Sequence, residues 1–293
     1  MKKDFHLLIL GGDVRQKEVA KIVHEKNVRV SLVGFDQLSD PSIERIKCDA
    51  QSIDYTQVDA ILVPVSGIDH EGTIEARFSR ENILFTKQDL AKTPEHCVIY
   101  TGIKTPFLDQ LVDATGRKVV PLFERDDMAI FNSIPTAEGT LKIAIEHTDF
   151  MIHGSQVMVL GYGRVGKTIA RLFDAVGAKV SVGARNEADL ARIIEVGLTP
   201  IRLNNLENEL SKVDICINTI PHKILTPAVL DNMAKHALII DVASKPGGTD
   251  FQYAQDIGLQ ALLELGIPGK VAAKSAGEIL AKVLIEILEV DFT

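Results

Sequence analysis

The sequence predicts an α/β protein with two Rossmann-like, doubly wound parallel-sheet domains joined by a long hinge helix, with a cleft between them. Three observations support this prediction. The 293 residues suffice for two domains that each bury a core. Apolar runs of strand length alternate with amphipathic segments of helix length in both halves, which favours parallel sheets. A glycine-rich turn between an apolar run and a helical segment lies in the middle of the chain, at residues 161–166.

Composition and charge limit the classes of function. The chain is 46% hydrophobic and 25% charged, as in soluble globular proteins, and its net charge of −8 without a run of Lys or Arg argues against nucleic-acid binding. No stretch is long enough to span a bilayer, and the first apolar run is too short for a signal peptide, so we expect a cytoplasmic protein with no membrane partner. The three cysteines, Cys48, Cys97 and Cys216, lack metal-ligand spacing, and we expect no metal site.

The first domain is expected over residues 1–131, with helices near 15–25 and 106–115. Its predicted strands are the apolar runs 6–10, 28–33, 60–65, 83–85, 97–101 and 118–123.

The first predicted strand ends in Gly11-Gly12-Asp13. Parallel α/β sheets bind their ligands at the carboxyl ends of strands, so Asp13, Arg15 and Gln16 are candidates for binding substrate. The alternative is that Asp13 caps the next helix and Arg15 is solvated. We expect no nucleotide here, because the third glycine is missing and Asp13 would repel phosphate.

Residues 132–153 are predicted to form the hinge helix. Asn132-Ser133 provides a start signal, Pro135 lies in the first turn, and apolar residues recur on one stripe. The second domain is then expected over 154–273. The tail, 274–293, is expected to form a helix that packs back on the first domain. We detect no internal repeat.

The strongest motif is the G-x-G-x-x-G of residues 161–166. An apolar strand precedes it, and a helix and a second strand at 179–182 follow, which is the context of a dinucleotide-binding βαβ unit. The glycines permit a tight bend, close approach of a diphosphate and close helix packing, and the first N–H groups of the helix face the phosphates. The alternative is an ordinary glycine-rich turn. The expected cofactor contacts are Gly161, Gly163, Arg164, Val165 and Gly166.

The end of the second strand favours NADP over NAD. An NAD site usually has a carboxylate there for the ribose hydroxyls, whereas this chain has Arg185, which can hold a 2′-phosphate. The alternative is a solvated Arg185, with Glu187 or Asp189 reaching back to the ribose.

Loops after two later strands are expected beside the nicotinamide ribose. The residues concerned are Asn218, Thr219, Ile220, Pro221 and Ala243. His222 and Lys245, in the same loops, are candidates for the acid or base. The alternative is ordinary turn chemistry and polar surface.

A buried dicarboxylate would need about two cations, because an unpaired buried carboxylate is costly. Arg15, Arg125 and Lys245 are the candidates. For Arg125 the alternative is that the run 124–127 is a solvated charge cluster.

Six further segments carry a family resemblance: 11–16, 33–36, 123–127, 132–139, 241–251 and 274–277. Together they resemble the family of A subunits of dipicolinate synthase from spore-forming bacteria. This chain departs from the family pattern at Lys245, Ala273 and Ser275, where charge or size is mostly kept.

The resemblance implies an NAD(P)-dependent oxidoreductase shaped like formate and glycerate dehydrogenases. It implies NADP-dependent oxidation of dihydrodipicolinate, or its hydroxy-tetrahydro precursor, to dipicolinate. It further implies that the partner is a flavoprotein-like B subunit, in the mother-cell cytoplasm during sporulation; a homodimer is also compatible. Two alternatives stay open: a dehydrogenase of a 2-hydroxy or 2-amino acid with this architecture, and a nucleotide-binding, non-catalytic subunit.

Overall fold

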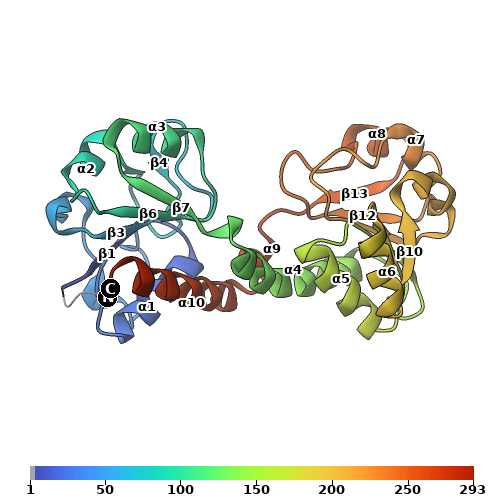
Figure 1. Ribbon diagram of the computed structural model, residues 1–293, viewed down its shortest axis with the longest axis horizontal. Helices are drawn as coiled ribbons and strands as arrows, with labels where there is room; N and C mark the ends of the chain where they lie inside the picture. Colours follow the sequence, from blue (N-terminus) through green and yellow to red (C-terminus); the bar gives the residue numbers. More distant parts are fainter. Residues whose placement is uncertain (1–3) are drawn as a thin grey trace. The chain divides into compact units, whose positions relative to one another are not determined.

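The computed structural model describes residues 4–293 and divides into two compact units (Figure 1). Unit 1 contains the residues up to Phe131 together with Ala273–Thr293, and unit 2 contains Asn132–Ala272. Each unit has a parallel sheet flanked by helices. The predicted fold class, two parallel-sheet α/β domains, is therefore confirmed.

Unit 1 is built on a five-stranded parallel sheet with the order β2-β1-β3-β6-β7. In this order β1 has two neighbours, and Ile9 pairs with Leu32 of β2 and Leu62 of β3. Every residue of β1 is buried, as expected for a strand covered on both faces. The strands are β1 (His6–Leu10), β2 (Arg29–Val33), β3 (Ala60–Leu62), β6 (Val98–Thr101) and β7 (Lys118–Pro121).

One predicted strand lies outside this sheet. The run at 83–85 forms β5 (Ile83–Leu84), which pairs antiparallel with β4 (Thr73–Ile74) in a separate two-stranded sheet. An apolar run this short looks the same in a hairpin and in a parallel sheet, so periodicity does not separate the two.

Helix α10 (Ala273–Asp291) returns to unit 1 and packs along α1 (Val14–Glu25). At their contact, a Cβ added to Gly277 would lie 2.7 Å from the backbone oxygen of Arg15. The buried face of α10, including Leu280 and Leu284, joins the apolar core beneath the sheet. The remaining helices of unit 1 are α2 (Lys87–Lys92), α3 (Pro106–Thr115) and the 3-10 helices η1 (Glu44–Ile46), η2 (Ala50–Ser52), η3 (Tyr55–Gln57) and η4 (Leu122–Glu124).

Unit 2 is built on a six-stranded parallel sheet with the order β10-β9-β8-β11-β12-β13, the order typical of dinucleotide-binding sheets. Its strands are β8 (Gln156–Leu160), β9 (Lys179–Ala184), β10 (Thr199–Arg202), β11 (Ile215–Asn218), β12 (Leu238–Asp241) and β13 (Gln260–Leu263). Its helices are α5 (Arg164–Ala175), α6 (Glu187–Glu195), α7 (Pro227–Leu230), α8 (Phe251–Asp256), α9 (Ile267–Val271) and the 3-10 helices η5 (Leu203–Asn208) and η6 (Leu210–Lys212).

The helix predicted at 132–153 is observed as α4 (Asp126–His147), and it contains the boundary between the units. Both predicted ends were therefore wrong. Asp126 and Asp127 form the acidic first turn of α4, which the positive end of the helix dipole favours. The sequence analysis places both residues in the charged run before the helix. Near the other end, the hydroxyl of Thr148 donates to the carbonyl of Ala144 at 2.8 Å, and the helix does not continue to residue 153.

Cys97 and Cys216 are buried, and burial raises the pKa of these thiols to about 11 and about 12. Residues 4–293 contain no group of three or more His, Cys, Asp or Glu placed to bind a metal ion. Among the same residues, no helix combines the length and the apolar character needed to cross a bilayer.

Candidate functional site

The glycine turn of unit 2 joins β8 to α5 at the carboxyl edge of the sheet. Gly161 has a φ of +98°, a left-handed conformation that favours glycine. Gly166 is buried, and a Cβ at this position would collide with the carbonyl oxygen of Gly161. Thr219, after the neighbouring strand, donates its hydroxyl to the carbonyl of Leu160 at 2.8 Å. Helix α5 is therefore held close to its strand, as the dinucleotide motif requires.

Helix α5 begins directly after a glycine. Gly163 is the N-cap residue and makes no side-chain cap hydrogen bond, and the first turn has no acidic residue. Apart from its chain neighbours, no heavy atom of the described residues lies within 4 Å of a Cβ built on Gly163. The first four N–H groups of a helix lack partners inside it, and the helix dipole adds positive charge there, so this end fits a diphosphate. Arg164 and Val165 lie in the same turn.

Strand β9, which follows α5, is followed directly by a cationic residue, Arg185. Arg185 follows β9, is exposed, and makes no hydrogen bond or ion pair with the part of the chain that the structure describes. The two carboxylates of the NAD alternative are engaged elsewhere. Arg202 Nη2 donates to Glu187 Oε2 at 2.7 Å and thereby lowers the pKa of Glu187. Asn186 bonds both the backbone and the side chain of Asp189, at 2.7 and 2.6 Å.

A buried carboxylate shapes the loops after β11 and β12. Asp241 is fully buried, and its oxygens accept hydrogen bonds from Asn218 Nδ2 (3.0 Å), the Ala243 N–H (3.1 Å), the Gly248 N–H (2.9 Å) and the Thr249 hydroxyl (2.7 Å). The strand ends where Asn218 and Ala243 were predicted to meet the cofactor are thus held by one buried carboxyl group. Sequence reasoning did not give Asp241 this role. The available signal was an acidic residue that ends an apolar strand and precedes a glycine loop.

The candidates for the acid or base lie on these loops. His222 and Lys245 are both exposed, and neither side chain has a hydrogen bond or ion pair within residues 4–293. Pro221 is exposed and Ile220 half-buried, with the Ile220 N–H donating to Asn218 Oδ1 at 3.0 Å. Because β8, β11 and β12 are adjacent and parallel, the loops emerge at the same edge as the glycine turn.

The first turn of unit 1 is closed by its own side chains. Asp13 caps α1, and Gln16 Oε1 accepts the Asp13 N–H at 3.0 Å, which completes a capping box. Arg15 is not solvated, because its Nε and Nη2 donate to the Asp13 carboxylate at 2.8–3.1 Å and its side chain is 16% exposed. Gln16 is 1% exposed, and substrate contact by this side chain remains a prediction.

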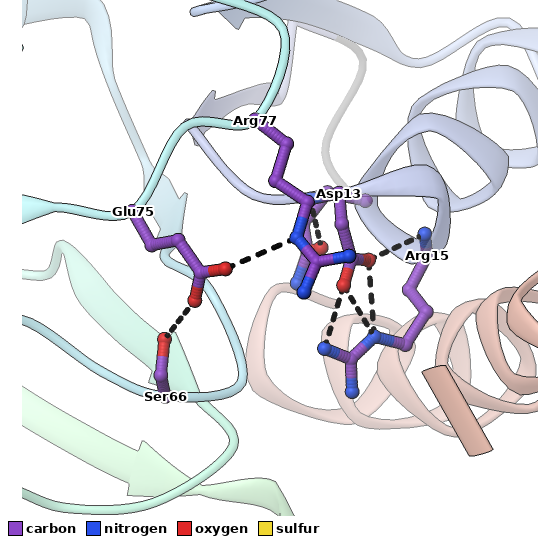
Figure 2. A network of polar contacts seen from close by, with 6 residues as sticks. Asp13, Arg15, Ser66, Glu75 and Arg77 are labelled. Carbon is purple, nitrogen blue, oxygen red and sulfur yellow. Dashed lines mark hydrogen bonds and ion pairs between the residues drawn. The ribbon is translucent and has the colours of Figure 1, made fainter. Parts of the chain in front are cut away.

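Asp13 is an anion at neutral pH. Burial raises its pKa, but the hydrogen bonds and charge of Arg15, together with the charge of Arg77, outweigh burial and lower the pKa below its usual value. Figure 2 shows both guanidinium groups near this carboxylate. Arg77 was missed in the sequence, because it follows a two-residue strand that periodicity did not separate from the loops around it.

Arg125 lies elsewhere in unit 1. It follows β7, and its guanidinium donates to Asp127 at 2.7 and 3.1 Å. β1 and β7 are three strand positions apart, roughly 14 Å at the usual spacing. The structure therefore brings Arg15 together with Arg77 and not with Arg125.

A hollow of about 850 Å³ lies at the carboxyl end of β2, lined among others by Gly34, Lys47 and Arg80. Lys47 is already paired with Glu44 at 2.8 Å and bonds the Leu38 carbonyl at 2.9 Å. The hollow includes neither the glycine turn nor Arg15, and we assign it no ligand.

Comparison with known proteins identifies relatives of the whole chain. Residues 6–123 match the family model of the N-terminal domain of the dipicolinate synthase A subunit, and residues 137–261 match that of the S-adenosyl-L-homocysteine hydrolase NAD binding domain. The dipicolinate synthase A subunit of Bacillus subtilis is 50% identical over 282 residues, covering 96% of this chain and 95% of the relative.

Solved structures agree in fold. The crystal structure of the dipicolinate synthase A subunit from Bacillus halodurans aligns with a TM-score of 0.95 at 50% identity, covering 98% of this chain and 99% of that one. The corresponding crystal structure from Bacillus subtilis aligns at 0.94 and 48% identity, covering 99% and 98%. D-lactate dehydrogenase from Escherichia coli, at 14% identity and a TM-score of 0.61, covering 98% and 97%, shares the fold.

Proposed function

The chain belongs to the family of dipicolinate synthase A subunits, and from this premise we propose that it oxidises dihydrodipicolinate, or its hydroxy-tetrahydro precursor, to dipicolinate with NADP. The observation that carries the proposal is the glycine turn of Gly161, Gly163 and Gly166 between β8 and α5, in a sheet of dinucleotide-binding order. A dehydrogenase-like architecture with a nicotinamide-nucleotide turn supports oxidoreductase chemistry.

NADP, and not NAD, is the proposed cofactor. Arg185 lies where the ribose 2′ position is expected and is without a partner in residues 4–293, while Glu187 is held by Arg202. A guanidinium attracts a 2′-phosphate and offers it a forked hydrogen bond. The turn of α5 would hold the diphosphate, and the ends of β11 and β12, held by Asp241, would lie beside the nicotinamide ribose.

When bound, the nicotinamide supplies a hydride acceptor. In becoming aromatic, the dihydro substrate loses one hydride and one proton, and His222 or Lys245 is the candidate that takes the proton. Arg15 is proposed to hold a carboxylate of the substrate, with Arg125 or Lys245 as the second cation predicted from the sequence. Asp13 would position Arg15 through the hydrogen bonds described above.

We further propose that the chain acts with a flavoprotein-like B subunit in the mother-cell cytoplasm of a sporulating bacterium. The proposal follows from family membership, because the designation of the relatives by the letter A implies a second component of the synthase.

The test is oxidation of freshly generated dihydrodipicolinate by the purified chain, followed through the absorbance of NADPH, with and without the B subunit. Turnover by the chain alone supports a catalytic role. If turnover is observed only when the B subunit is present, the result favours a nucleotide-binding, non-catalytic role for this chain. Oxidation of 2-hydroxy or 2-amino acids in place of the dihydropyridine would replace the proposal with the other dehydrogenase.

Arg15→Ala tests the substrate site. We expect the KM for the dicarboxylate to rise by about tenfold or more, because a charge-assisted hydrogen bond is lost. The affinity for NADP should not change, since Arg15 lies in unit 1 and the glycine turn in unit 2. A fall in NADP affinity instead would show that this turn contacts the cofactor.

A further inference from the structure

The turn after β1 lies in a polar cluster that draws on three segments of unit 1. Figure 2 shows Asp13 and Arg15 from the first turn, Ser66 from the loop after β3, and Glu75 and Arg77 from the segment after β4. All five belong to one unit, so the cluster is defined without reference to unit 2.

The backbone fixes Arg77 beside the first turn. The Gly12 N–H donates to the Glu75 carbonyl at 2.7 Å, and the Arg77 N–H donates to the Gly12 carbonyl at 3.0 Å. A Cβ added to Gly11 would lie 2.6 Å from the Glu75 carbonyl oxygen, so the two segments approach as closely as a glycine permits. Glu75 and Arg77 are therefore held next to the turn by main-chain contacts.

Arg77 keeps most of its hydrogen-bonding capacity available. Its Nε donates to Glu75 Oε1 at 3.2 Å, whereas neither terminal nitrogen has a partner among the described residues. A guanidinium has five N–H donors in a planar fork, so four remain. In Arg15, Nε and Nη2 bind Asp13, and Nη1 has no partner in the described chain. Two guanidinium groups with free N–H donors thus lie near one carboxylate.

The contacts of the two arginines differ in strength. The Arg15–Asp13 pair is bidentate, and the side chains are 16% and 6% exposed, so this guanidinium is held in place. The Arg77–Glu75 pair has a single contact between side chains that are 58% and 49% exposed. Exposed ion pairs contribute little, so an incoming carboxylate can replace Glu75 on Arg77. Glu75 then keeps the hydroxyl of Ser66, which donates to its other oxygen at 3.1 Å.

We infer that Arg77 is a substrate-binding residue: it binds the second carboxylate of the dicarboxylate whose first carboxylate Arg15 binds. The inference rests on the proposed function for the nature of the substrate. It assigns to Arg77 the role that the sequence gave to Arg125, because Arg77, unlike Arg125, adjoins the turn that carries Arg15.

The experiment compares two ligands that differ by one carboxylate. Pyridine-2,6-dicarboxylate and pyridine-2-carboxylate are titrated calorimetrically into the full-length chain saturated with NADPH. The variants are Arg77→Gln and Arg77→Lys. Arg80→Gln is the matched control, because Arg80 is an exposed arginine three residues further along the same segment. NADPH affinity, measured first, reports on folding and on unit 2.

We expect the wild type to prefer the dicarboxylate. Arg77→Gln should weaken dicarboxylate binding by about 10- to 100-fold, as for loss of hydrogen bonds to a charged group, and leave the monocarboxylate almost unchanged. Arg77→Lys should recover part of the preference, since it restores charge but not the fork. Arg80→Gln should behave as the wild type.

Three results would contradict these assignments, each in a different way. If Arg77→Gln keeps the preference for the dicarboxylate, the role of Arg77 is refuted while the proposed function survives. If inorganic phosphate binds as tightly as the dicarboxylate and also depends on Arg77, the site is a general anion site. If the wild type binds NADPH but neither pyridine acid, the proposed function fails, and the assignment of Arg77 fails with it.

Discussion

In both units the first strand passes through a three-residue turn into a helix of the same length, yet the two turns are built differently. In unit 1 the N-cap residue is Asp13, and Gln16 folds back onto the turn. In unit 2 the corresponding positions are Gly163 and Gly166, and the N-cap residue has no side chain with which to cap the helix. The elements keep the same spacing, because β1, α1 and β2 begin at His6, Val14 and Arg29 and β8, α5 and β9 begin at Gln156, Arg164 and Lys179, 150 residues later in each case.

The opposite edges of the two sheets are alike. The backbone N–H of His6 donates to Asp59, at 3.0 Å, and Asp59 also pairs with His96, at 2.6 Å. In unit 2 the N–H of Gln156 donates to Asp214, at 2.7 Å, and Asp214 pairs with His236, at 2.8 Å. Each first strand is therefore anchored at its amino end by an aspartate that also binds a histidine.

The comparison indicates where binding and stability are determined. The amino edges repeat the same contacts, which suits a structural role. The carboxyl edges, where α/β sheets bind ligands, have diverged: unit 2 has a glycine turn, which we propose holds a diphosphate, and unit 1 uses its own carboxylate there to hold an arginine. We therefore expect changes at the carboxyl edges to alter ligand binding and changes at the amino edges to alter stability.

Gly163→Asp makes the second turn resemble the first, and we expect the largest effect from it. The carboxylate would occupy the N–H groups of α5 and repel the diphosphate, so NADP affinity should fall by about 100-fold or more, the loss of about two charged hydrogen bonds. The fold should persist, because a Cβ there meets no other segment of the described chain, the φ of −82° is ordinary, and Asp is a favourable N-cap. Calorimetric titration with NADPH measures the loss.

Arg171→Asp is the control, since it places a carboxylate on an exposed position of the same helix, two turns further on. It should leave NADPH affinity nearly unchanged. Tight NADPH binding by Gly163→Asp would show that the glycine turn does not bind the cofactor. The difference between the turns of the two units would then have no bearing on ligand binding.

Asp59→Ala and Asp214→Ala test the amino edges. Asp59 is 3% exposed, and its removal leaves the buried N–H of His6 without an acceptor, a cost of about 1–3 kcal/mol. Asp214 has a side chain that is 27% exposed, so water can replace it and the cost should be smaller. Hydrogen exchange of the β1 and β8 amides reports each unit separately. Reduced NADPH affinity in Asp214→Ala would contradict a purely structural role.

Arg185→Asp sharpens the comparison at the end of the second strand, where unit 1 has Phe35 at the equivalent position. We expect NADP affinity to fall about tenfold or more while NAD affinity changes little, because only NADP carries the 2′-phosphate. NAD thus serves as the internal control, and the readout is the ratio of the two dissociation constants. Equal losses for both nucleotides would show that Arg185 does not contact the 2′-phosphate.

Patterns with a fixed spacing were sufficient for the fold and the nucleotide turn. The alternation of runs predicted both parallel sheets, and the glycine spacing predicted the turn at Gly161, because each is a local requirement of the backbone. The start of α4 was misplaced, since Asp126 and Asp127 suit a charged loop and an acidic first turn equally well. The internal similarity of the units went undetected, because it lies in spacing and contacts and not in residue identity.

Side-chain contacts between segments that are distant in the sequence could not be predicted from spacing. Arg15 was selected because it follows the first strand, but its bidentate pairing with Asp13 and the proximity of Arg77 depend on how the segment after β4 returns to the turn. Likewise, the sequence shows that Asp241 ends a strand, but it does not show that the four hydrogen-bond donors to Asp241 come from the end of β11 and from the loop after β12. Spacing indicates which residues reach an edge, and tertiary contacts decide which of them meet.

His6→Gln gives the smallest expected effect, and it makes the first position of β1 match Gln156 of β8. His6 is 2% exposed, and its ring bonds the Ser31 hydroxyl at 2.9 Å and the Gln57 carbonyl at 3.2 Å. Burial, with the charge of Arg29, lowers its pKa below 6.5, so the folded state favours the neutral ring.

The unfolded chain therefore binds the proton more readily than the folded one, and the stability contributed by the neutral ring is complete above pH 6.5 and declines as the pH falls below it. Denaturant unfolding across this range should show the wild type losing stability toward acid, with His6→Gln losing less. His24→Gln, which replaces an exposed histidine of the same unit, should keep the wild-type slope. Equal slopes of unfolding free energy against pH for the wild type and His6→Gln would mean that folding does not change the pKa of the buried His6 ring. The amino edge of unit 1 would then resemble that of unit 2 in electrostatics as well as in geometry.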